Sequence, residues 1–356
     1  MNILRIAKII KEVKETLQLD LKGLTVYTEA GTGMYACTPV IAALAGAEKV
    51  YAISRDTRYG TSEQAVREVN QIAAAIHDTL VDRICHIHNK IDQQLFEADI
   101  VTNLGHVRPI DKTMINKLNN DKVVIPYMCE AWEVRPGDVD LNECLLNNIP
   151  VMGTNETHPG VNCFKTCGHL VAKLLFEAGL EIRKNKIAIF SSDHFGHVIH
   201  DLLQQLEADV TLFECVKSLN ESNLDSLDAL IIADYMNRNV LVGERGLIDL
   251  KKIAEQSSGI VLVPFAGHCE MEYVKSLGIQ MYPMMNLEPV RMSRTLAHVG
   301  PMPTIELLAA GLKVGELMRR AKKPNLTISE IVSQIETDKI WAELAQPIHM
   351  GTMEGK

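Results

Sequence analysis

The sequence predicts an α/β protein of two domains, each built on a parallel β-sheet with helices on both faces. Three observations support this fold class. The chain has 356 residues, which is about two domains' worth of protein. Short apolar, β-prone runs alternate with amphipathic segments in both halves, as parallel sheets with crossover helices require. The stretch 186–214 has the length and order of a complete strand–helix–strand unit and ends in an acidic residue.

The first half is expected to begin with an amphipathic helix, because its apolar residues recur at helical spacing. Strands at 24–30 and 49–54 follow, separated by a turn containing Gly31 and Gly33 and by a short helix. The rest of this half is expected to hold a long helix at about 62–80 and strands near 83–87, 98–102, 122–126 and 149–152.

A mostly apolar helix over 161–181 should lead into the second half. The strands expected there are 186–190, 209–214, 229–233, 260–264, 279–283 and 295–299, and a helix over 304–321 should return to the first half. Residues 1–160 with 304–356 are therefore expected to form a flavodoxin- or Rossmann-like substrate domain, and 161–303 a degenerate Rossmann domain of the dinucleotide-binding type. The predicted fold is two Rossmann-like domains around a central cleft, joined by two interdomain helices.

Composition narrows the classes of function. The net charge is −9 and no basic run is visible, so a nucleic-acid partner is not expected. No apolar run reaches membrane-spanning length, and lysines interrupt the apolar residues of the N-terminus, so neither a membrane anchor nor a signal peptide is expected. The eight cysteines are scattered without framework spacing, which favours reduced thiols and a cytoplasmic protein.

The turn of the 186–214 unit lacks two of the three glycines that a dinucleotide-binding turn carries. Where the pattern G-x-G-x-x-G would stand, the chain runs from Ser191 to Gly196 and keeps only the last glycine, which serves helix-against-strand packing. Asp193 replaces the glycine that lets the backbone approach a pyrophosphate. Ser191 and Asp193 are good helix caps, but an aspartate at a helix N-terminus places a carboxylate where a phosphate would bind.

The second half resembles the D-isomer-specific 2-hydroxyacid dehydrogenases. The resemblance is carried by the segment 147–162 before the long helix, by the strand–helix–strand unit closing on Glu214, by the pair Glu288-Pro289, and by His298-Val299-Gly300 followed by Thr304. The resemblance implies an NAD-dependent oxidoreductase that acts on a small carboxylate-bearing substrate, and a homodimer.

The same resemblance implies roles for individual residues. His298 and Glu288 would relay the proton, with the glutamate keeping the imidazole charged and oriented. The arginine that the family places after a core strand is missing here, so Arg291 or Arg294 would hold the substrate carboxylate. The cofactor residues implied are Ser191, Asp193, His194, Gly196 and Glu214, and Glu214 would favour NAD over NADP.

Three polar clusters follow predicted strands of the first half. They lie at 103–108, 130–135 and 154–159. Because the carboxyl ends of parallel strands meet at one edge of a sheet, these clusters are expected to line one ligand site. The substrate-binding candidates are Asn103, His106, Arg108, Glu130, Arg135, Asn155 and His158, with the two arginines as carboxylate or phosphate anchors.

Two alternatives stay open. The segment Glu29-Ala30-Gly31-Thr32-Gly33 looks like the nucleotide-binding turn of an S-adenosylmethionine-dependent methyltransferase, with Asp56 as a ribose ligand, although a lone G-x-G is weak and a tight turn that needs small residues is the favoured explanation. A non-redox small-molecule enzyme on the same scaffold is therefore the second interpretation, and a non-catalytic binding protein without a cofactor is the third. No metal site is expected, because His197 and His200 lack a convergent third ligand.

Overall fold

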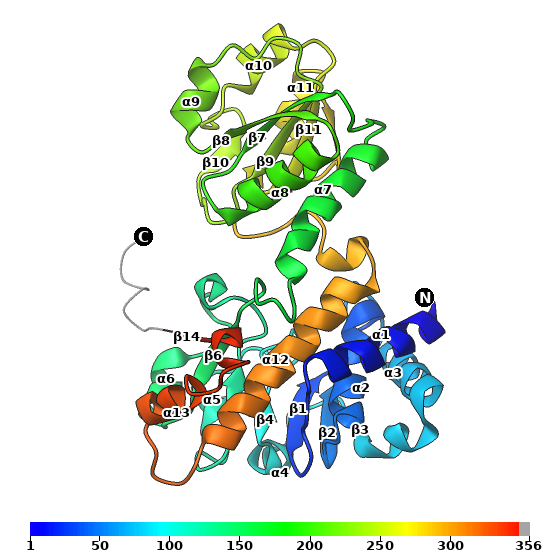
Figure 1. Ribbon diagram of the computed structural model, residues 1–356, viewed down its shortest axis with the longest axis vertical. Helices are drawn as coiled ribbons and strands as arrows, with labels where there is room; N and C mark the ends of the chain where they lie inside the picture. The colour runs from blue at the N-terminus through cyan, green and yellow to red at the C-terminus, as the bar shows by residue number, and fades with distance from the viewer. Residues whose placement is uncertain (349–356) are drawn as a thin grey trace. The chain divides into compact units, whose positions relative to one another are not determined.

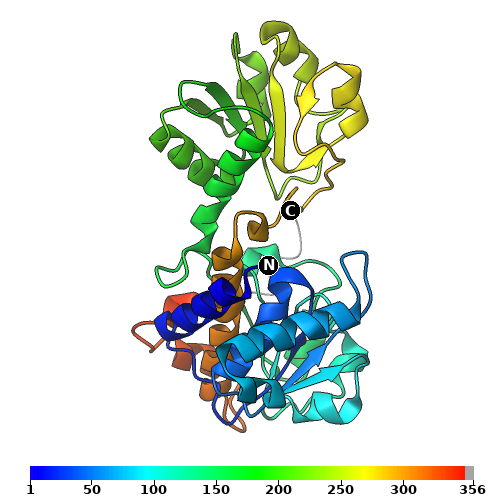
Figure 2. The same cartoon turned by 90° about the vertical axis from the view of Figure 1, so that its right-hand side faces the viewer.

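The computed structural model describes residues 1–348 and divides into two compact units. Unit 1 comprises Met1–Cys163 together with the chain from Pro301 onward, and unit 2 comprises Phe164–Gly300. Figures 1 and 2 show helices packed against the sheet in each unit. No helix among residues 1–348 is both long enough and apolar enough to cross a membrane.

Unit 1 contains one mixed β-sheet. Its strands are β1 (Thr25–Glu29), β2 (Lys49–Ile53), β3 (Ile84–Ile87), β4 (Ile100–Val101), β5 (Ile125–Pro126), β6 (Val151–Thr154) and β14 (Ala345–Pro347). The order β3-β2-β1-β4 continues into β5-β6-β14, because Val101 N donates to Val124 O (3.0 Å) and Val124 N donates to Asp99 O (2.9 Å). All of these pairings are parallel except that of β14 with β6.

Helices cover both faces of this sheet because its central strands are apolar on both sides. Val50 and Ala52 belong to one buried core, and Tyr51 and Ile53 to the other. The first core also contains α1 (Ile3–Thr16), α2 (Cys37–Leu44), α3 (Ser62–Ile76), α12 (Pro301–Ala321) and α13 (Ile328–Ile335). The second core contains α4 (Asp92–Glu97), α5 (Lys112–Ile115) and α6 (Leu141–Leu146). Figure 1 shows α12 crossing the unit 1 sheet.

Unit 2 has a parallel sheet of the order β13-β11-β9-β7-β8. The strands are β7 (Lys186–Phe190), β8 (Asp209–Phe213), β9 (Ala229–Ala233), β11 (Val261–Ala266) and β13 (Gln280–Met281), with a separate pair β10 (Val240–Val242) and β12 (His268–Cys269). One face packs on α7 (Thr166–Glu177) and α8 (His194–Gln205). The other packs on α9 (Val216–Glu221), α10 (Leu250–Gln256) and α11 (Met271–Ser276).

The strand orders of the two units differ in a way that matters for ligands. Counted along the chain, the parallel strands of unit 1 follow the order 3-2-1-4-5-6, which is the common order of dinucleotide-binding domains. The five strands of unit 2 follow the flavodoxin-like order 2-1-3-4-5. The sequence predicts the dinucleotide-binding type for 161–303, whereas the structure gives that strand order to unit 1.

Most of the predicted strands are confirmed. One predicted strand and the bounds of two predicted helices differ from the expectation. The run 295–299 is not a strand but a short 3₁₀ helix, Leu296–His298, because His298 N donates back to Thr295 O (2.9 Å) just before α12 begins at Pro301. The helix expected at 62–80 ends at Ile76, where extended His77 caps a second 3₁₀ helix, Asp78–Arg83. The helix expected at 161–181 is confined to Thr166–Glu177 and follows the 3₁₀ turn Cys163–Lys165. Three further 3₁₀ helices are Gly33–Ala36, Ala131–Glu133 and Ala342–Leu344.

Candidate functional sites in the two units

The turn after β7 is closed by the carboxylate of Asp193. Asp193 is the N-cap of α8, as the sequence predicted: its Oδ1 accepts the N–H of Phe195 (3.0 Å) and the hydroxyl of Ser191 (3.0 Å). Its Oδ2 accepts the N–H of Tyr235 (2.7 Å) and lies 3.4 Å from the N of Met236, both from the loop after β9. The carboxylate therefore occupies the N–H of Phe195 at this helix N-terminus and the N–H of Tyr235 in the neighbouring loop, and Ser191 Oγ accepts the N–H of Gly196 (3.1 Å).

The environment of Asp193 disfavours a second anion. Burial raises the pKa of its carboxyl, and the hydrogen bonds from Phe195, Ser191 and Tyr235 offset part of this effect. Asp234, on the adjacent loop, adds another carboxylate that accepts the Ser192 hydroxyl (2.9 Å). A diphosphate at this turn would displace or repel Asp193, so the usual seat of a dinucleotide does not fit one here.

Gly196 packs α8 against the sheet, as predicted. A Cβ at this position would lie 2.6 Å from Ser191 Cβ and 2.8 Å from Leu212 Cδ1 in β8, so only glycine allows this approach. Of the other implied cofactor residues, Glu214 lies beyond β8 with its side chain 69% exposed, and it pairs with His197 Nε2 (3.3 Å). His194 is exposed on the first turn of α8. The residues of the turn after β7 thus lie together, but the polar groups of Ser191 and Asp193 bind each other and the backbone.

His298 pairs with a carboxylate that the sequence did not single out. Its Nε2 donates to Glu177 Oε2 (2.9 Å) and lies 3.1 Å from Oε1, and Glu177 belongs to α7. The Tyr282 hydroxyl donates to the same carboxylate (2.9 Å), and Lys173 Nζ donates to the His298 carbonyl (2.6 Å). The hydrogen bond from His298 lowers the pKa of Glu177. The group is therefore an ionised carboxylate holding an imidazole.

The predicted partner of His298 lies elsewhere. Glu288 is exposed, and within residues 1–348 no hydrogen bond or ion pair joins it to His298. The expected pairing of His298 with Glu288 is replaced by one with Glu177, because the 3₁₀ turn at 296–298 directs the imidazole onto α7. Arg291 is exposed too, and Arg294 Nη1 donates to the Ser293 carbonyl (3.3 Å).

In unit 1, buried polar groups gather where β1 and β4 end. Glu29, the last residue of β1, accepts the N–H of His106 (2.9 Å), and burial raises the pKa of its carboxyl. The hydroxyls of Thr28 and Thr102 are 2.8 Å apart. Asn103 Oδ1 accepts the N–H of Met128 (2.8 Å), which joins the β4 loop to β5. This edge is the point at which the strand order reverses, where ligands bind in such sheets.

The two predicted arginine anchors are paired with carboxylates of the chain. Arg108 Nη1 donates to both Asp138 oxygens (2.8 Å each), and Arg135 Nη2 lies 3.5 Å from Glu133 Oε2. The predicted ligand Glu130 is buried and its Oε1 accepts the N–H of Glu156 (2.8 Å). Burial raises the pKa of Glu156 well above its usual value, with Glu133 and Glu130 adding to the effect. These side chains build the loops after β5 and β6.

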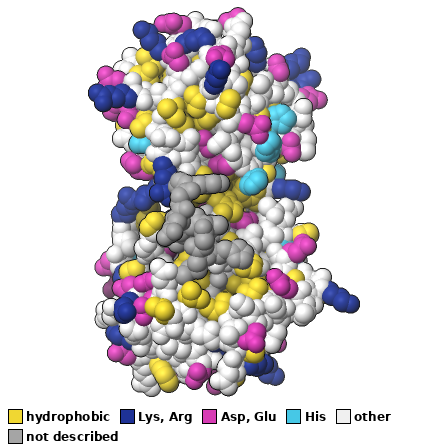
Figure 3. Space-filling model, turned by 90° about the vertical axis from the view of Figure 1, so that its left-hand side faces the viewer, with side chains coloured by type: hydrophobic (Ala, Val, Ile, Leu, Met, Phe, Trp, Pro, Cys, Tyr) yellow, Lys and Arg dark blue, Asp and Glu magenta, His cyan; other side chains and the backbone are white. Residues whose placement is uncertain are grey.

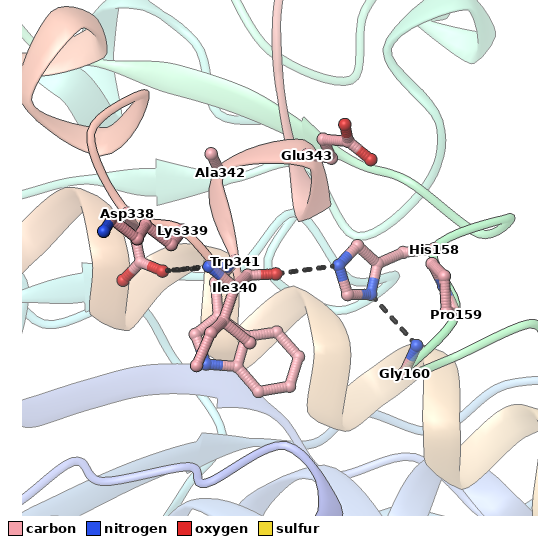
Figure 4. A pocket seen from close by; sticks show the side chains of 9 residues that line it. All are labelled: His158, Pro159, Gly160, Asp338, Lys339, Ile340, Trp341, Ala342 and Glu343. Atoms are coloured by element: carbon pink, nitrogen blue, oxygen red, sulfur yellow. Dashed lines mark hydrogen bonds between the residues drawn. The ribbon is translucent and has the colours of Figure 1, made fainter.

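The side chains of Asn155 and His158 also form hydrogen bonds with the backbone. Asn155 Nδ2 donates to the Glu343 carbonyl (2.9 Å). His158 Nδ1 accepts the N–H of Gly160 (3.1 Å), so its Nε2 carries the proton given to the Ile340 carbonyl (3.1 Å), and its ring stacks on Trp341 at 5.5 Å. Figure 4 shows this arrangement in a pocket of about 520 Å³. Both ring nitrogens are used, which makes His158 a structural residue of this pocket.

The sequence did not single out three residues of unit 1, one on α3 and two after strand ends. Glu68 of α3 accepts the N–H of Gly33 (2.6 Å), so the glycine turn also carries a carboxylate of the protein. Arg55 follows β2 and Lys90 follows β3. The rule that sites lie beyond strand ends would have indicated Arg55 and Lys90, whereas nothing in the sequence pairs Glu68 with a turn 35 residues away.

The surface charge and the grouping of possible metal ligands bear on which classes of ligand the candidate sites could hold. Figure 3 shows acidic and basic side chains interspersed over one face of the molecule, without a large basic area. Among residues 1–348, no three His, Cys, Asp or Glu side chains are grouped as a metal site would require. The candidate sites therefore rest on hydrogen-bonding and charged side chains.

The comparisons with known proteins concern the fold. No protein-family model and no curated protein matches the chain. Among solved structures, a dipicolinate synthase chain from Bacillus subtilis aligns over 86% of this chain and 100% of its own, with 12% identity and a TM-score of 0.53. The corresponding protein from Bacillus halodurans aligns over 82% and 96% (13% identity, TM-score 0.51), and the pyruvate reductase of Chlamydomonas reinhardtii over 87% and 100% (10%, 0.52).

At such low identity the likeness establishes the fold and nothing finer. It confirms the α/β class and the two-domain, parallel-sheet architecture. The chain is therefore similar in fold to these dipicolinate synthase and pyruvate reductase structures, with two α/β units built on parallel strands.

Proposed function

We propose that the chain is a non-redox small-molecule enzyme that binds S-adenosylmethionine at the glycine turn of unit 1. One observation carries the proposal: the protein places its own carboxylate on both turns that could hold a phosphate. Asp193 accepts the N–H of Phe195 after β7 and the N–H of Tyr235 after β9, and Glu68 accepts the N–H of Gly33 after β1. Two unit charges about 4 Å apart near a protein surface repel by about 4 kcal/mol, which weakens a diphosphate ligand roughly a thousandfold.

The acids that exclude a diphosphate suit a cationic nucleoside. Glu29 and Glu68 present carboxylates to the turn, and carboxylates bind ammonium, sulfonium and ribose hydroxyl groups. Gly33 has φ +66, and no atom of residues 1–348 would lie within 4 Å of a Cβ added there, which leaves open space beside the backbone. Asp56, the proposed ribose ligand, is exposed beyond β2, with one oxygen capping α3 through Ser62 N (2.8 Å).

Calorimetric titration of the full chain with S-adenosylmethionine tests the proposal. Gly33→Asp should abolish binding, because it adds a carboxylate and a side chain at the proposed contact. Gly23→Asp is the matched control: Gly23 has φ +74 and equally open space within the described chain, so it carries the same backbone strain at the opposite end of β1. Equal binding by wild type and Gly33→Asp, or no heat at millimolar S-adenosylmethionine, contradicts the proposal.

A nicotinamide-dependent dehydrogenase acting on a small carboxylate is the second candidate. The His298–Glu177 pair supports it, because an imidazole held by an ionised carboxylate is the acid–base group that such an enzyme uses. This candidate stands second because the unit 2 turn does not fit a dinucleotide. Titration with NADH decides: micromolar affinity lost in His298→Ala or in Glu177→Gln would favour this candidate, and no thermal shift at millimolar NADH excludes it.

A further inference from the structure

Side chains that can carry a positive charge follow three strands of the unit 1 sheet, two of them on one side of β1 and the third on the other. Arg55 follows β2, Lys90 follows β3, and His106 follows β4. The strand ends are in register: Ser54 N donates to Ile87 O (2.9 Å) and Thr102 N donates to Tyr27 O (3.0 Å). These loops therefore share the edge of the sheet that carries the glycine turn.

Two contacts connect these loops. Lys90 Nζ donates to the carbonyl of Pro109 (2.8 Å), which ties the loop after β3 to the loop after β4. His106 donates its N–H to Glu29 at the end of β1. Burial, followed by the charge of Arg55, lowers the pKa of both Lys90 and His106, so Arg55 lies close enough to act on each.

The guanidinium of Arg55 is available to bind a ligand. It is exposed, and among residues 1–348 no hydrogen bond or ion pair involves its guanidinium, whereas Arg108 is paired with Asp138. Four acidic residues at or after the ends of β1, β2, β3 and β4 have other partners. Asp56 caps α3 (2.8 Å to Ser62 N), Asp111 caps α5 (2.9 Å to Met114 N), Glu29 binds His106 N, and Asp92 pairs with Lys117 (2.8 Å).

The hydroxyl of Tyr27 adds an independent observation. Tyr27 is fully buried in β1, and its hydroxyl has no hydrogen-bond partner within the described part of the chain. Burial raises its pKa to about 12, and the charge of Arg55 offsets part of this effect. A buried hydroxyl without a partner is uncommon in folded proteins, and a free O–H donor can bind an oxyanion.

We propose that Arg55, with Lys90 and His106, binds an anionic group of the substrate, a carboxylate or a phosphate, beside the glycine turn. The inference rests on the proposed function and deepens it: the molecule that reacts with the nucleoside cofactor is an acid. Its anionic group binds at the Arg55 guanidinium, while the sulfonium faces the acidic side of the same edge. Arginine suits this role because its planar fork binds both oxygens of an oxyanion.

The test uses two probes on the full chain, inorganic phosphate and malonate, followed by calorimetry. Wild type should bind at least one of them, and Arg55→Met should weaken that binding by about tenfold or more. Arg58→Met is the matched control: Arg58 lies on the same exposed loop but is engaged with the hydroxyl and ring of Tyr59 (2.6 and 4.8 Å), so binding should change less than about twofold. The stronger probe identifies the oxyanion.

The outcomes separate this inference from the proposed function. Loss of anion binding in Arg55→Met but not in Arg58→Met, with unchanged circular dichroism, supports the inference even if S-adenosylmethionine does not bind. Equal anion binding in wild type and Arg55→Met overturns it, as does the absence of heat with both probes at millimolar concentration in low salt, where charge attraction is least screened. Binding of S-adenosylmethionine alone, without either anion, would retain the proposed function and refute the anion site.

Discussion

Removing the carboxylate of Asp193 should destabilise unit 2 by a measurable amount. In Asp193→Ala, α8 loses its N-cap, which costs about 1 kcal/mol. The N–H of Tyr235, a residue only 2% exposed, loses its acceptor, and a buried unsatisfied donor costs about 1 to 3 kcal/mol. We therefore expect a loss of about 2 to 4 kcal/mol in the free energy of unfolding. Asp193→Asn keeps one acceptor oxygen and should lose about half as much.

Urea unfolding followed by far-UV circular dichroism measures this loss, at pH 8 because burial raises the pKa of Asp193. Amide hydrogen exchange, read by mass spectrometry, localises it. Peptides covering 191–199 and 230–237 should exchange faster in Asp193→Ala, while peptides from β1 in unit 1 should be unchanged. A loss below about 0.5 kcal/mol, with unaltered exchange in those two peptides, would refute the assignment of Asp193 as the group that closes this turn.

The same variant tests the charge argument against a dinucleotide. If the carboxylate repels a diphosphate, NADH should bind Asp193→Ala about a hundredfold or more tightly than wild type. Asp193→Asn, which removes the charge but keeps the volume, separates repulsion from crowding. Micromolar binding of NADH by wild type would show that the turn accommodates a diphosphate after all.

Packing and protonation lead to three more expected outcomes. Burial raises the pKa of Glu306 to about 7, so the fold loses stability as pH rises from the usual glutamate pKa to about 7, and the loss is complete above that pH; Glu306→Gln should raise the free energy of unfolding by about 1 to 2 kcal/mol at pH 8 and by nothing near pH 4 in urea titrations. Gly196→Ala should lose about 1 to 3 kcal/mol in thermal unfolding because its Cβ would meet Leu212 at 2.8 Å, whereas Gly300→Ala, with no described atom within 4 Å, should not. Binding of S-adenosylmethionine should strengthen as pH rises through the raised pKa of Glu29, since the carboxylate form attracts the cation; calorimetry across pH that shows flat affinity would contradict this.

The sequence alone determined the features that depend on near neighbours. Short apolar runs specified most strands of both sheets, because a strand covered by helices on both faces is apolar at successive positions. The cap at Asp193 and the close packing at Gly196 were predictable for the same reason: both act within a few residues along the chain. The run 295–299 shows the limit of such patterns, since an apolar segment before Pro301 closed into a 3₁₀ turn instead of joining the sheet.

Only the tertiary structure decided which charges meet. His298 and Glu177 are 121 residues apart in sequence, and α7 brings them together by packing on the turn that carries His298. Arg108 was equally suited to a ligand and to Asp138, and the fold pairs it with Asp138, whereas the guanidinium of Arg55 has no carboxylate partner among residues 1–348. The type of a side chain determines what it can bind, but its actual partner depends on how the fold brings distant segments together. The reversal of strand order beside β1 likewise exists only once the sheet has formed.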